Sequence, residues 1–213
     1  MDRRELLKMI AVLTGGAVVG AEAFLTGCKN AETVSTAFTE KDVAFLDEIA
    51  ETILPATNTP GAKAAKVGQF MTVIVNDCYD ENDQKTFHDG MKQLNDASDK
   101  KYGHSFMKAS PQERHDLLVD LDKEAKEHQK KRKEFMDAQD MKEKQAQQAG
   151  DKNFKKEQMP NHYFSLMKQL TLWGYFTSRE GMMQALHYVP VPGRYEGCID
   201  YKKGDKAYAG LGG

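Results

Sequence analysis

The stretch Val67-Gly68-Gln69-Phe70-Met71-Thr72-Val73-Ile74-Val75-Asn76-Asp77-Cys78 decides the fold class. Its apolar residues recur at the i, i+3, i+4, i+7, i+8 and i+11 positions of one helix face, which are Val67, Phe70, Met71, Ile74, Val75 and Cys78. This stripe predicts a helix that buries one face in a hydrophobic core. No stretch alternates apolar and polar residues for long, so we expect an all-α fold.

Further helices are predicted on both sides of this stripe. Before it, Thr39 is a candidate N-cap for a helix that Pro55 ends. After it, we expect a helix from about residue 82, a helix opened by a capping box at Ser110 with Pro111 in its first turn, and a core helix after Pro160. Ser178 should cap a short helix that carries Met183 and Leu186. The expected core residues are Val43, Leu46, Ile49, Ala50, Ile53, Phe87, Met91, Leu94, Leu117, Leu118, Leu121, Ala125, Tyr163, Leu166, Met167, Leu170 and Trp173.

Residues 120–158 differ from the rest because more than half of them are charged, in nearly balanced signs. Oppositely charged pairs such as Asp122 and Lys126 lie one helical turn apart, which favours a solvated helix over a membrane or nucleic-acid surface. We expect this helix to run out of the body and back, with a turn near Gly150. From Val189 onward, the Pro- and Gly-rich sequence predicts ordered coil. The expected architecture is a single compact helical domain (residues 39–213) with a long charged helical excursion.

The N-terminus reads as an export signal followed by a lipid attachment site. Arg3 and Arg4 form a twin-arginine pair before a weakly apolar stretch (residues 9–25), and Leu25-Thr26-Gly27-Cys28 has the pattern of a lipobox. We expect residues 1–27 to be a signal peptide, Cys28 to be lipidated and residues 28–38 to be a tether. The protein would then be a membrane-anchored lipoprotein on the periplasmic side of the cell envelope. Two alternatives are a general secretory signal and a membrane-spanning or buried helix.

The net charge and the cysteines limit which partners and which covalent bonds are expected. The chain of 213 residues has 30 basic and 32 acidic residues and a net charge of -2, so nucleic acid is not an expected partner. Cys78 and Cys198 could form a disulfide in an oxidising compartment. Equally, Cys78 could be a plain buried thiol on the apolar face of its helix.

No recognised pattern of catalytic or metal-binding residues occurs in the sequence. The six histidines lack the spacing of ligand sets, and His88, His104, His115 and His128 lie in polar contexts that suggest exposure. Nucleotide-binding, phosphate-binding and acyl-transfer signatures are also missing. We therefore expect no catalytic, cofactor-binding or metal-binding residues on this chain, and a role in supporting chemistry done elsewhere.

Two longer motifs resemble the gluconate 2-dehydrogenase subunit 3 family, also called the gamma chain. They are Thr52-Ile53-Leu54-Pro55-Ala56-Thr57-Asn58-Thr59-Pro60-Gly61-Ala62, and Tyr175-Phe176-Thr177-Ser178-Arg179-Glu180-Gly181 with the later run from Tyr188 to Cys198. The resemblance implies a small helical accessory subunit of a membrane-bound periplasmic sugar or polyol dehydrogenase. Its catalytic partner would be a large FAD flavoprotein of the GMC type, and electrons would leave through a cytochrome c subunit. FAD and haem c would then belong to those partners.

The C-terminal coil is the candidate surface for such a partner. Pro190, Pro192 and Gly193 should make it rigid, so that it displays Tyr188, Arg194 and Tyr195, and tyrosine and arginine are enriched at interface hot spots. The alternative is that these residues close the domain's own core. For the whole chain, two other functions stay open, namely a free-standing periplasmic scaffold or binding lipoprotein and an enzyme with an unrecognised histidine site.

Overall fold

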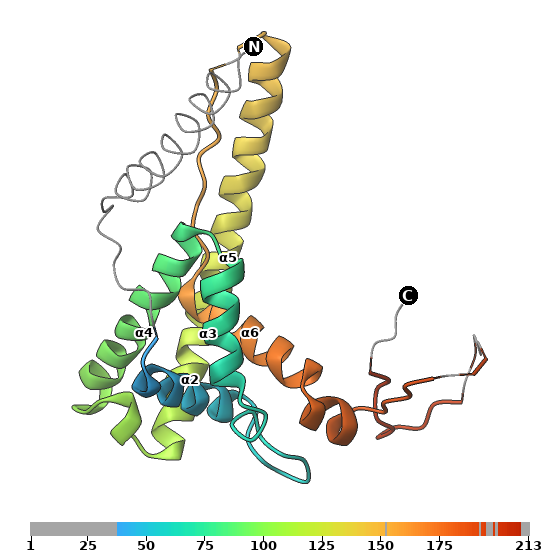
Figure 1. Ribbon diagram of the computed structural model, residues 1–213. Helices are drawn as coiled ribbons and strands as arrows, with labels where there is room; N and C mark the ends of the chain where they lie inside the picture. Colours follow the sequence, from blue (N-terminus) through green and yellow to red (C-terminus); the bar gives the residue numbers. More distant parts are fainter. Residues whose placement is uncertain (1–37, 152, 192, 195–197, 199, 210–213) are drawn as a thin grey trace, which may run out of the picture. The chain divides into compact units, whose positions relative to one another are not determined.

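The computed structural model describes residues 38–151, 153–191, 193, 194, 198 and 200–209, which form helices joined by loops and coil (Figure 1). The α-helices are α2 (Glu40–Ile53), α3 (Val67–Cys78), α4 (Glu81–Tyr102), α5 (Pro111–Gln148) and α6 (Tyr163–Thr177), with a short 3₁₀-helix η1 (Phe106–Lys108) and a π-helix η2 (Gly181–Ala185). Within the described part of the chain, strand pairing is limited to one isolated bridge between His187 and Tyr208. The all-α prediction is confirmed.

The predicted helix starts are set by local capping. The Thr39 hydroxyl accepts from the backbone N–H of Asp42 (3.3 Å), and the Asp42 carboxylate accepts from the N–H of Thr39 (2.8 Å). Ser110 and Glu113 form the same reciprocal pair at the start of α5, with 3.3 and 2.8 Å distances. Each pair satisfies two N–H groups that a helix start would otherwise leave unpaired.

The hydrophobic core lies where α2, α3, α4, the first part of α5 and α6 meet. Most predicted core residues are buried, whereas Val43 and Ile53 are only partly buried. Gly90 allows α4 to approach α6 closely, because a Cβ there would lie 2.2 Å from the Cβ of Tyr163. Trp173 is a wrong core prediction, since it is 48% exposed and rests edge-on against the Phe70 ring.

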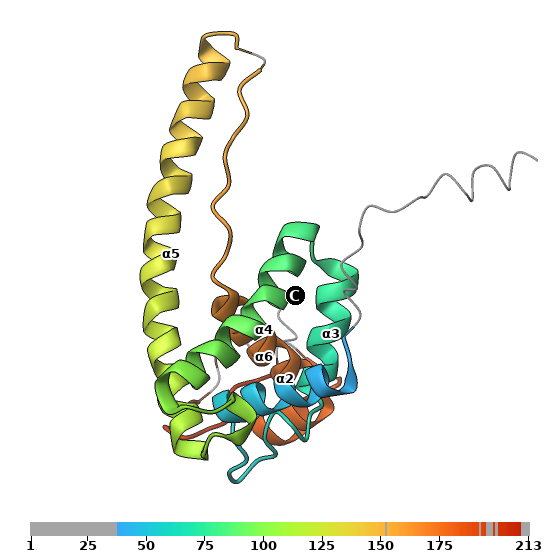
Figure 2. The ribbon, with the colours of Figure 1, turned by 90° about the vertical axis from the view of Figure 1, so that its left-hand side faces the viewer.

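Beyond Ala125, α5 leaves the core and continues as an arm (residues 126–161), which Figure 2 shows as a helix beside an extended segment. The outward helix and the turn at Gly150, whose φ is 74°, agree with the prediction. The return was expected to be helical, and it is coil. The distance that the return segment must cover explains why it is not helical. The outward helix covers about 35 Å at roughly 1.5 Å per residue. The dozen residues that return could cover this distance only when extended, at roughly 3.3 Å per residue.

Side-chain contacts hold the return segment against the arm's helix. Arg132 Nε donates to the carbonyl of Met159 (2.8 Å), and Gln139, which is buried, donates to Glu157 (3.3 Å). Lys156 pairs with Asp140 on the helix. These contacts replace the apolar packing that this charged sequence cannot supply.

The C-terminal coil is anchored beside η2. His187 N donates to Ala207 O (2.8 Å), Ala209 N donates to His187 O (3.0 Å), and the Lys206 ammonium group donates to Gln184 O (2.5 Å). Ala209 is buried. The described residues from Val189 onward contain no helix, as expected, and residues 206–209 are held against His187 and Gln184.

Candidate partner interface

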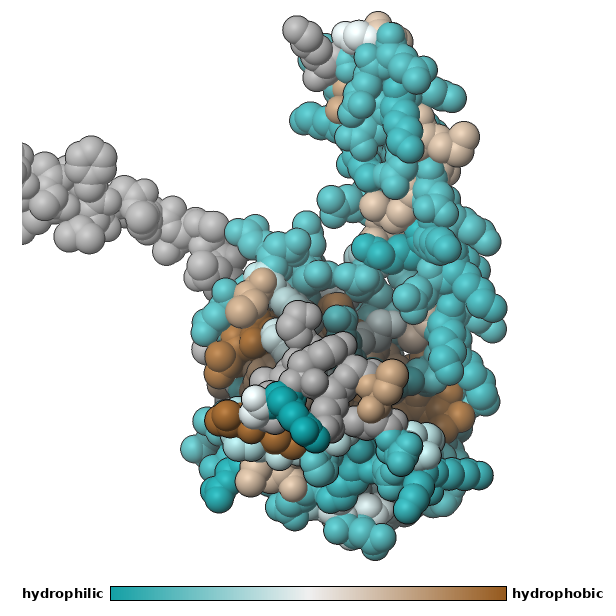
Figure 3. Space-filling view, turned by 90° about the vertical axis from the view of Figure 1, so that its right-hand side faces the viewer, coloured by the Kyte–Doolittle hydropathy of each residue, from teal (hydrophilic) through white to brown (hydrophobic). Residues whose placement is uncertain are grey.

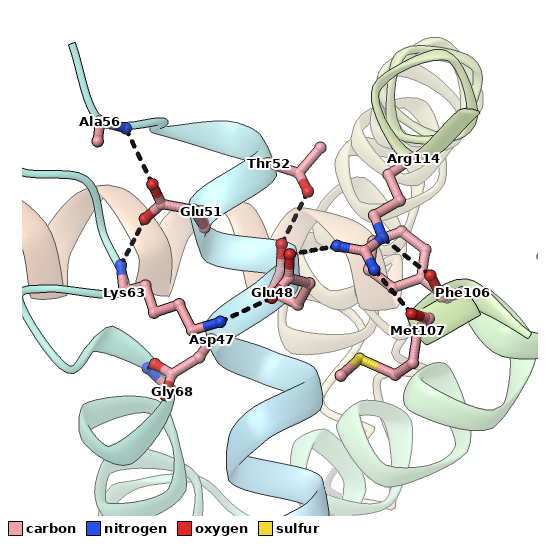
Figure 4. Close-up of polar contacts among 10 residues, drawn as sticks. All are labelled: Asp47, Glu48, Glu51, Thr52, Ala56, Lys63, Gly68, Phe106, Met107 and Arg114. Carbon is pink, nitrogen blue, oxygen red and sulfur yellow. Dashed lines mark hydrogen bonds and ion pairs between the residues drawn. The ribbon is translucent and has the colours of Figure 1, made fainter. Parts of the chain in front are cut away.

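The loop between α2 and α3, called the α2–α3 loop below, carries the first sequence motif and is held by carboxylates of α2 (Figure 4). Glu51 accepts from the N–H groups of Ala56 (2.9 Å) and Lys63 (2.8 Å), so it bridges both sides of the loop. Asp47 accepts from Gly68 N (2.8 Å) at the start of α3. Burial raises the pKa of Asp47, although the Gly68 N–H lowers it.

The motif residues of this loop close the domain itself. A Cβ at Gly61 would lie 2.2 Å from the Glu51 carboxylate, so glycine lets the loop pass close to α2. The Tyr175 hydroxyl donates to Pro60 O (2.7 Å) and thereby ties the loop to α6. In the first motif, Pro60 and Gly61 therefore serve the packing of the domain itself.

Glu48 of α2 links this loop to α5 through ion pairs with Lys63 and Arg114 (Figure 4). Its carboxylate pairs with Lys63 (2.9 Å) and with Arg114 of α5, and Arg114 also donates to the carbonyls of Phe106 (2.9 Å) and Met107 (2.8 Å). Desolvation raises the pKa of Glu48, but hydrogen bonds and charges from Lys63 and Arg114 outweigh it and lower the pKa. Arg114 therefore fastens α2, η1 and α5 together.

The second motif forms a tight joint between α6 and η2. The Ser178 hydroxyl accepts from Gly181 N (3.0 Å), as expected of a capping serine, and donates to Tyr175 O (2.6 Å). A Cβ at Gly181 would lie 2.0 Å from Tyr175 O, so this close approach requires glycine. These contacts fix how the chain turns from the end of α6 into η2.

Beside this joint, the body exposes large apolar side chains. Val73 of α3 is 50% exposed, and Trp173 and Phe176 lie one helical turn apart on the outer side of α6 with 48% and 38% exposure. Phe70, one turn before Val73 in α3, lies against Trp173 (ring centroids 5.3 Å apart) and links the two helices. Val73, Trp173 and Phe176, with Phe70 between them, are called the α3–α6 patch below. Figure 3, which views the body from the side of the C-terminal coil, shows brown apolar areas on the body, whereas the arm is mainly teal.

Sequence reasoning missed this patch because it assigned Trp173 to the core. A signal was present in the stretch Leu170-Thr171-Leu172-Trp173-Gly174-Tyr175-Phe176, which is apolar around most of the helix. A helix that is apolar on all sides requires burial of more than one face. Leu170, Thr171 and Tyr175 satisfy the core face, and Trp173 and Phe176 are left on the other.

The residues predicted to contact a partner lie on the C-terminal coil. Tyr188 and Arg194 are both exposed, as an interface role requires. Tyr195 lies outside the described residues, and so do Arg3, Arg4 and Cys28 of the predicted export signal and lipid site.

Both candidate cysteines are free and exposed in the structure. The structure therefore does not contain a bond between Cys78 and Cys198, and the alternative of a buried Cys78 thiol is wrong. Cys78 is the last residue of α3, where the apolar stripe of this helix has passed the edge of the core.

The histidines are less exposed than the sequence suggested. His88 stacks on Phe38 (centroids 4.3 Å apart), and His128 lies near His162 (5.5 Å). His115 is exposed as expected, whereas His88, His104 and His128 are only partly exposed. Each of these three has one buried ring nitrogen without a hydrogen-bond partner among the described residues. In the same residues, no cluster of three or more potential metal ligands occurs. Nor does any described helix combine the length and apolar character needed to cross a membrane.

Comparison with known families gives one match. The profile described as gluconate 2-dehydrogenase subunit 3 matches residues 40–193, which run from the start of α2 into the C-terminal coil. Searches of curated proteins and of solved structures returned no match. The matched region is well over half of the chain and contains the α2–α3 loop and the α6–η2 joint, together with the later run from Tyr188 as far as Gly193. The chain therefore belongs to the gluconate 2-dehydrogenase subunit 3 family.

Proposed function

We propose that this chain is the non-catalytic accessory subunit of a periplasmic, membrane-associated, FAD-dependent sugar or polyol dehydrogenase. Family membership supports the coarser part of this statement, because it indicates an accessory subunit of a dehydrogenase complex. In the proposal, a large GMC-type flavoprotein carries FAD and the substrate site. A cytochrome c subunit with haem c would accept the electrons.

The observation that carries the proposal is the α3–α6 patch. Val73, Trp173 and Phe176 are exposed on a chain in which 29% of the residues are charged. Aromatic residues are enriched and charged residues depleted in the cores of protein interfaces. We infer that the flavoprotein covers this patch, and that Tyr188 and Arg194 of the coil contact it at the margin.

The N-terminal motifs supply the second part of the proposal. A twin-arginine signal at Arg3 and Arg4 would carry folded protein across the membrane, and a flavoprotein without a signal of its own could travel bound to this chain. Lipid on Cys28 would then anchor the complex. Intact-mass measurement of the mature protein tests this, because a chain that begins at Cys28 and carries a diacylglycerol is expected, and an unmodified N-terminus would refute the anchor.

The interface is tested by purifying the protein from its native membrane in mild detergent, with mass spectrometry and a flavin absorbance scan. A stoichiometric large flavoprotein is expected. Val73→Asp puts a charge into the patch and should reduce flavoprotein recovery by at least about tenfold. Met141→Asp is the matched control, because Met141 is 64% exposed on the arm and its change should leave recovery unaltered.

Two further outcomes separate the alternatives. The double variant Arg194→Ala with Tyr195→Ala tests whether the coil contacts the flavoprotein. If it recovers as much flavoprotein as the parent, the coil is not part of the interface. If Val73→Asp and Met141→Asp both leave recovery unchanged while their circular dichroism spectra match the parent, the patch is not the interface. A lone, colourless lipoprotein would favour the second candidate function, a free-standing scaffold that uses the long charged arm.

A further inference from the structure

A cleft between α5 and α6 lies at the base of the arm. Its volume is about 380 Å³, within the range of roughly 300 to 1,000 Å³ that is usual for small-ligand sites. Lys126, His128 and Arg132 line it from α5, and His162, Lys168 and Leu172 line it from the side of α6. Basic and imidazole side chains thus make up half of the polar residues that line the cleft.

The charge balance of the cleft is positive. Among the described residues that line it, the one carboxylate is Asp122, which pairs with both Lys126 (2.7 Å) and Lys168 (2.5 Å). This group of three side chains keeps one positive charge, and Arg132 adds a second. Glu124 lies outside the lining residues and is 68% exposed, at 3.8 Å from His162 Nε2. If each lysine and arginine counts as +1, Asp122 as −1 and each histidine as neutral, the lining residues carry a net charge of +2.

Hydrogen-bond donors are also available in the cleft. Arg132 donates from Nε to Met159 O (2.8 Å), which holds the guanidinium at the cleft. Among the described residues, its other N–H groups have no hydrogen-bond partner, so they can donate to a ligand. His162 Nδ1 accepts from Phe164 N (3.3 Å), so the neutral ring carries its proton on Nε2. The Lys168 ammonium group, which Asp122 holds at the cleft wall (2.5 Å), is a further donor. A ligand with several acceptor oxygens would satisfy these groups.

We propose that this cleft binds a phosphate group of a small organic phosphate or of a lipid headgroup. A phosphate ester offers negative charge and several oxygens, and the planar guanidinium of arginine matches phosphate with two parallel hydrogen bonds. The cleft exceeds the size of the phosphate itself, and the apolar lining residues Ala125, Leu166 and Leu172 can contact the organic part. The proposed accessory function does not require this site.

The test is isothermal titration calorimetry of the purified full-length chain with two probes, glycerol 3-phosphate and monomeric dihexanoylphosphatidylglycerol. Dihexanoylphosphatidylcholine is the control for the lipid, since its headgroup has no net charge. One saturable site is expected for one of the probes. Preference for glycerol 3-phosphate assigns a soluble phosphate ester, and preference for the anionic lipid assigns a headgroup.

Three variants locate the site. Arg132→Gln and Lys168→Gln should each weaken binding by at least about tenfold, because each removes a charged hydrogen-bond donor. Lys168→Gln is needed beside Arg132→Gln because it leaves the Met159 contact intact. Lys131→Gln, at an exposed position outside the cleft, removes the same charge and should change affinity less than about twofold. No saturable binding of either probe, or equal weakening by Lys131→Gln, would overturn the proposal whatever the pull-down shows.

Discussion

At the scale of single residues, Arg114 sets the relation between three elements. Its guanidinium contacts Glu48 of α2 and two carbonyls of η1, and its side chain is only 12% exposed. The sequence does not reveal this role, because Glu48 lies 66 positions away and Arg114 occurs among ordinary polar residues of α5. Long-range polar partners depend on the packed fold, whereas the caps at Thr39 and Ser110 depend on residues three positions away and were predictable.

Arg114→Met should lower the free energy of unfolding by about 2–3 kcal/mol, because it leaves a partly buried carboxylate and two carbonyls without their donor. Lys63→Met removes the other partner of Glu48, but the Lys63 side chain is 57% exposed, so a loss below about 1 kcal/mol is expected. Urea unfolding of both variants measures the difference. Equal losses of unfolding free energy in the two variants would show that Arg114 does not stabilise the fold more than Lys63 does.

At the scale of elements, the sequence predicts the conformation of the arm's outward helix but not that of its return segment. The outward helix follows from its own sequence, since charged pairs one turn apart favour a helix locally. The return segment has a similar charge content and is extended, because its few residues must span the distance that the helix has covered. Its conformation is thus a consequence of the fold and has no local signal in the sequence.

Shortening the arm should leave the body folded. The buried apolar residues of α5 are Leu117, Leu118, Leu121 and Ala125, all before the arm begins. Replacing residues 141–155 with a short glycine-rich turn keeps Gln139 and Glu157 and removes little apolar packing. We expect one cooperative thermal transition within a few degrees of the parent by circular dichroism. A broad, non-cooperative transition would mean that the arm contributes to the core.

At the scale of the whole molecule, the sequence predicts the all-α class and most of the core but not which large apolar side chains stay exposed. Apolar periodicity shows which residues need burial, and it does not distinguish burial inside the chain from burial against another chain. Trp173 shows this, because its apolar character led to a core assignment although it is half exposed. The resemblance to the family came from the loop and joint motifs, whose glycines and prolines have backbone roles.

The histidines should make the whole domain less stable in mild acid. Burial lowers the pKa of both His88 and His162 below the ordinary value of 6.5, against nearby carboxylates that raise it. The unfolded chain therefore binds more protons than the folded chain just below pH 6.5. Stability is then complete above pH 6.5 and falls as the pH drops through the lowered values. Asp47 cannot cause this fall, because its raised pKa acts in the opposite direction.

Thermal unfolding of the full-length chain between pH 7.5 and 5.5 measures this effect. The midpoint should fall with pH in the parent, and the double variant His88→Gln with His162→Asn should show a flatter profile. Asn is chosen at position 162 because it can still accept the hydrogen bond from Phe164 N at the start of α6. His115→Asn is the control, since His115 is exposed, and it should keep the parent's profile. A parent midpoint that stays constant over this range would contradict the assignment of buried, neutral histidines.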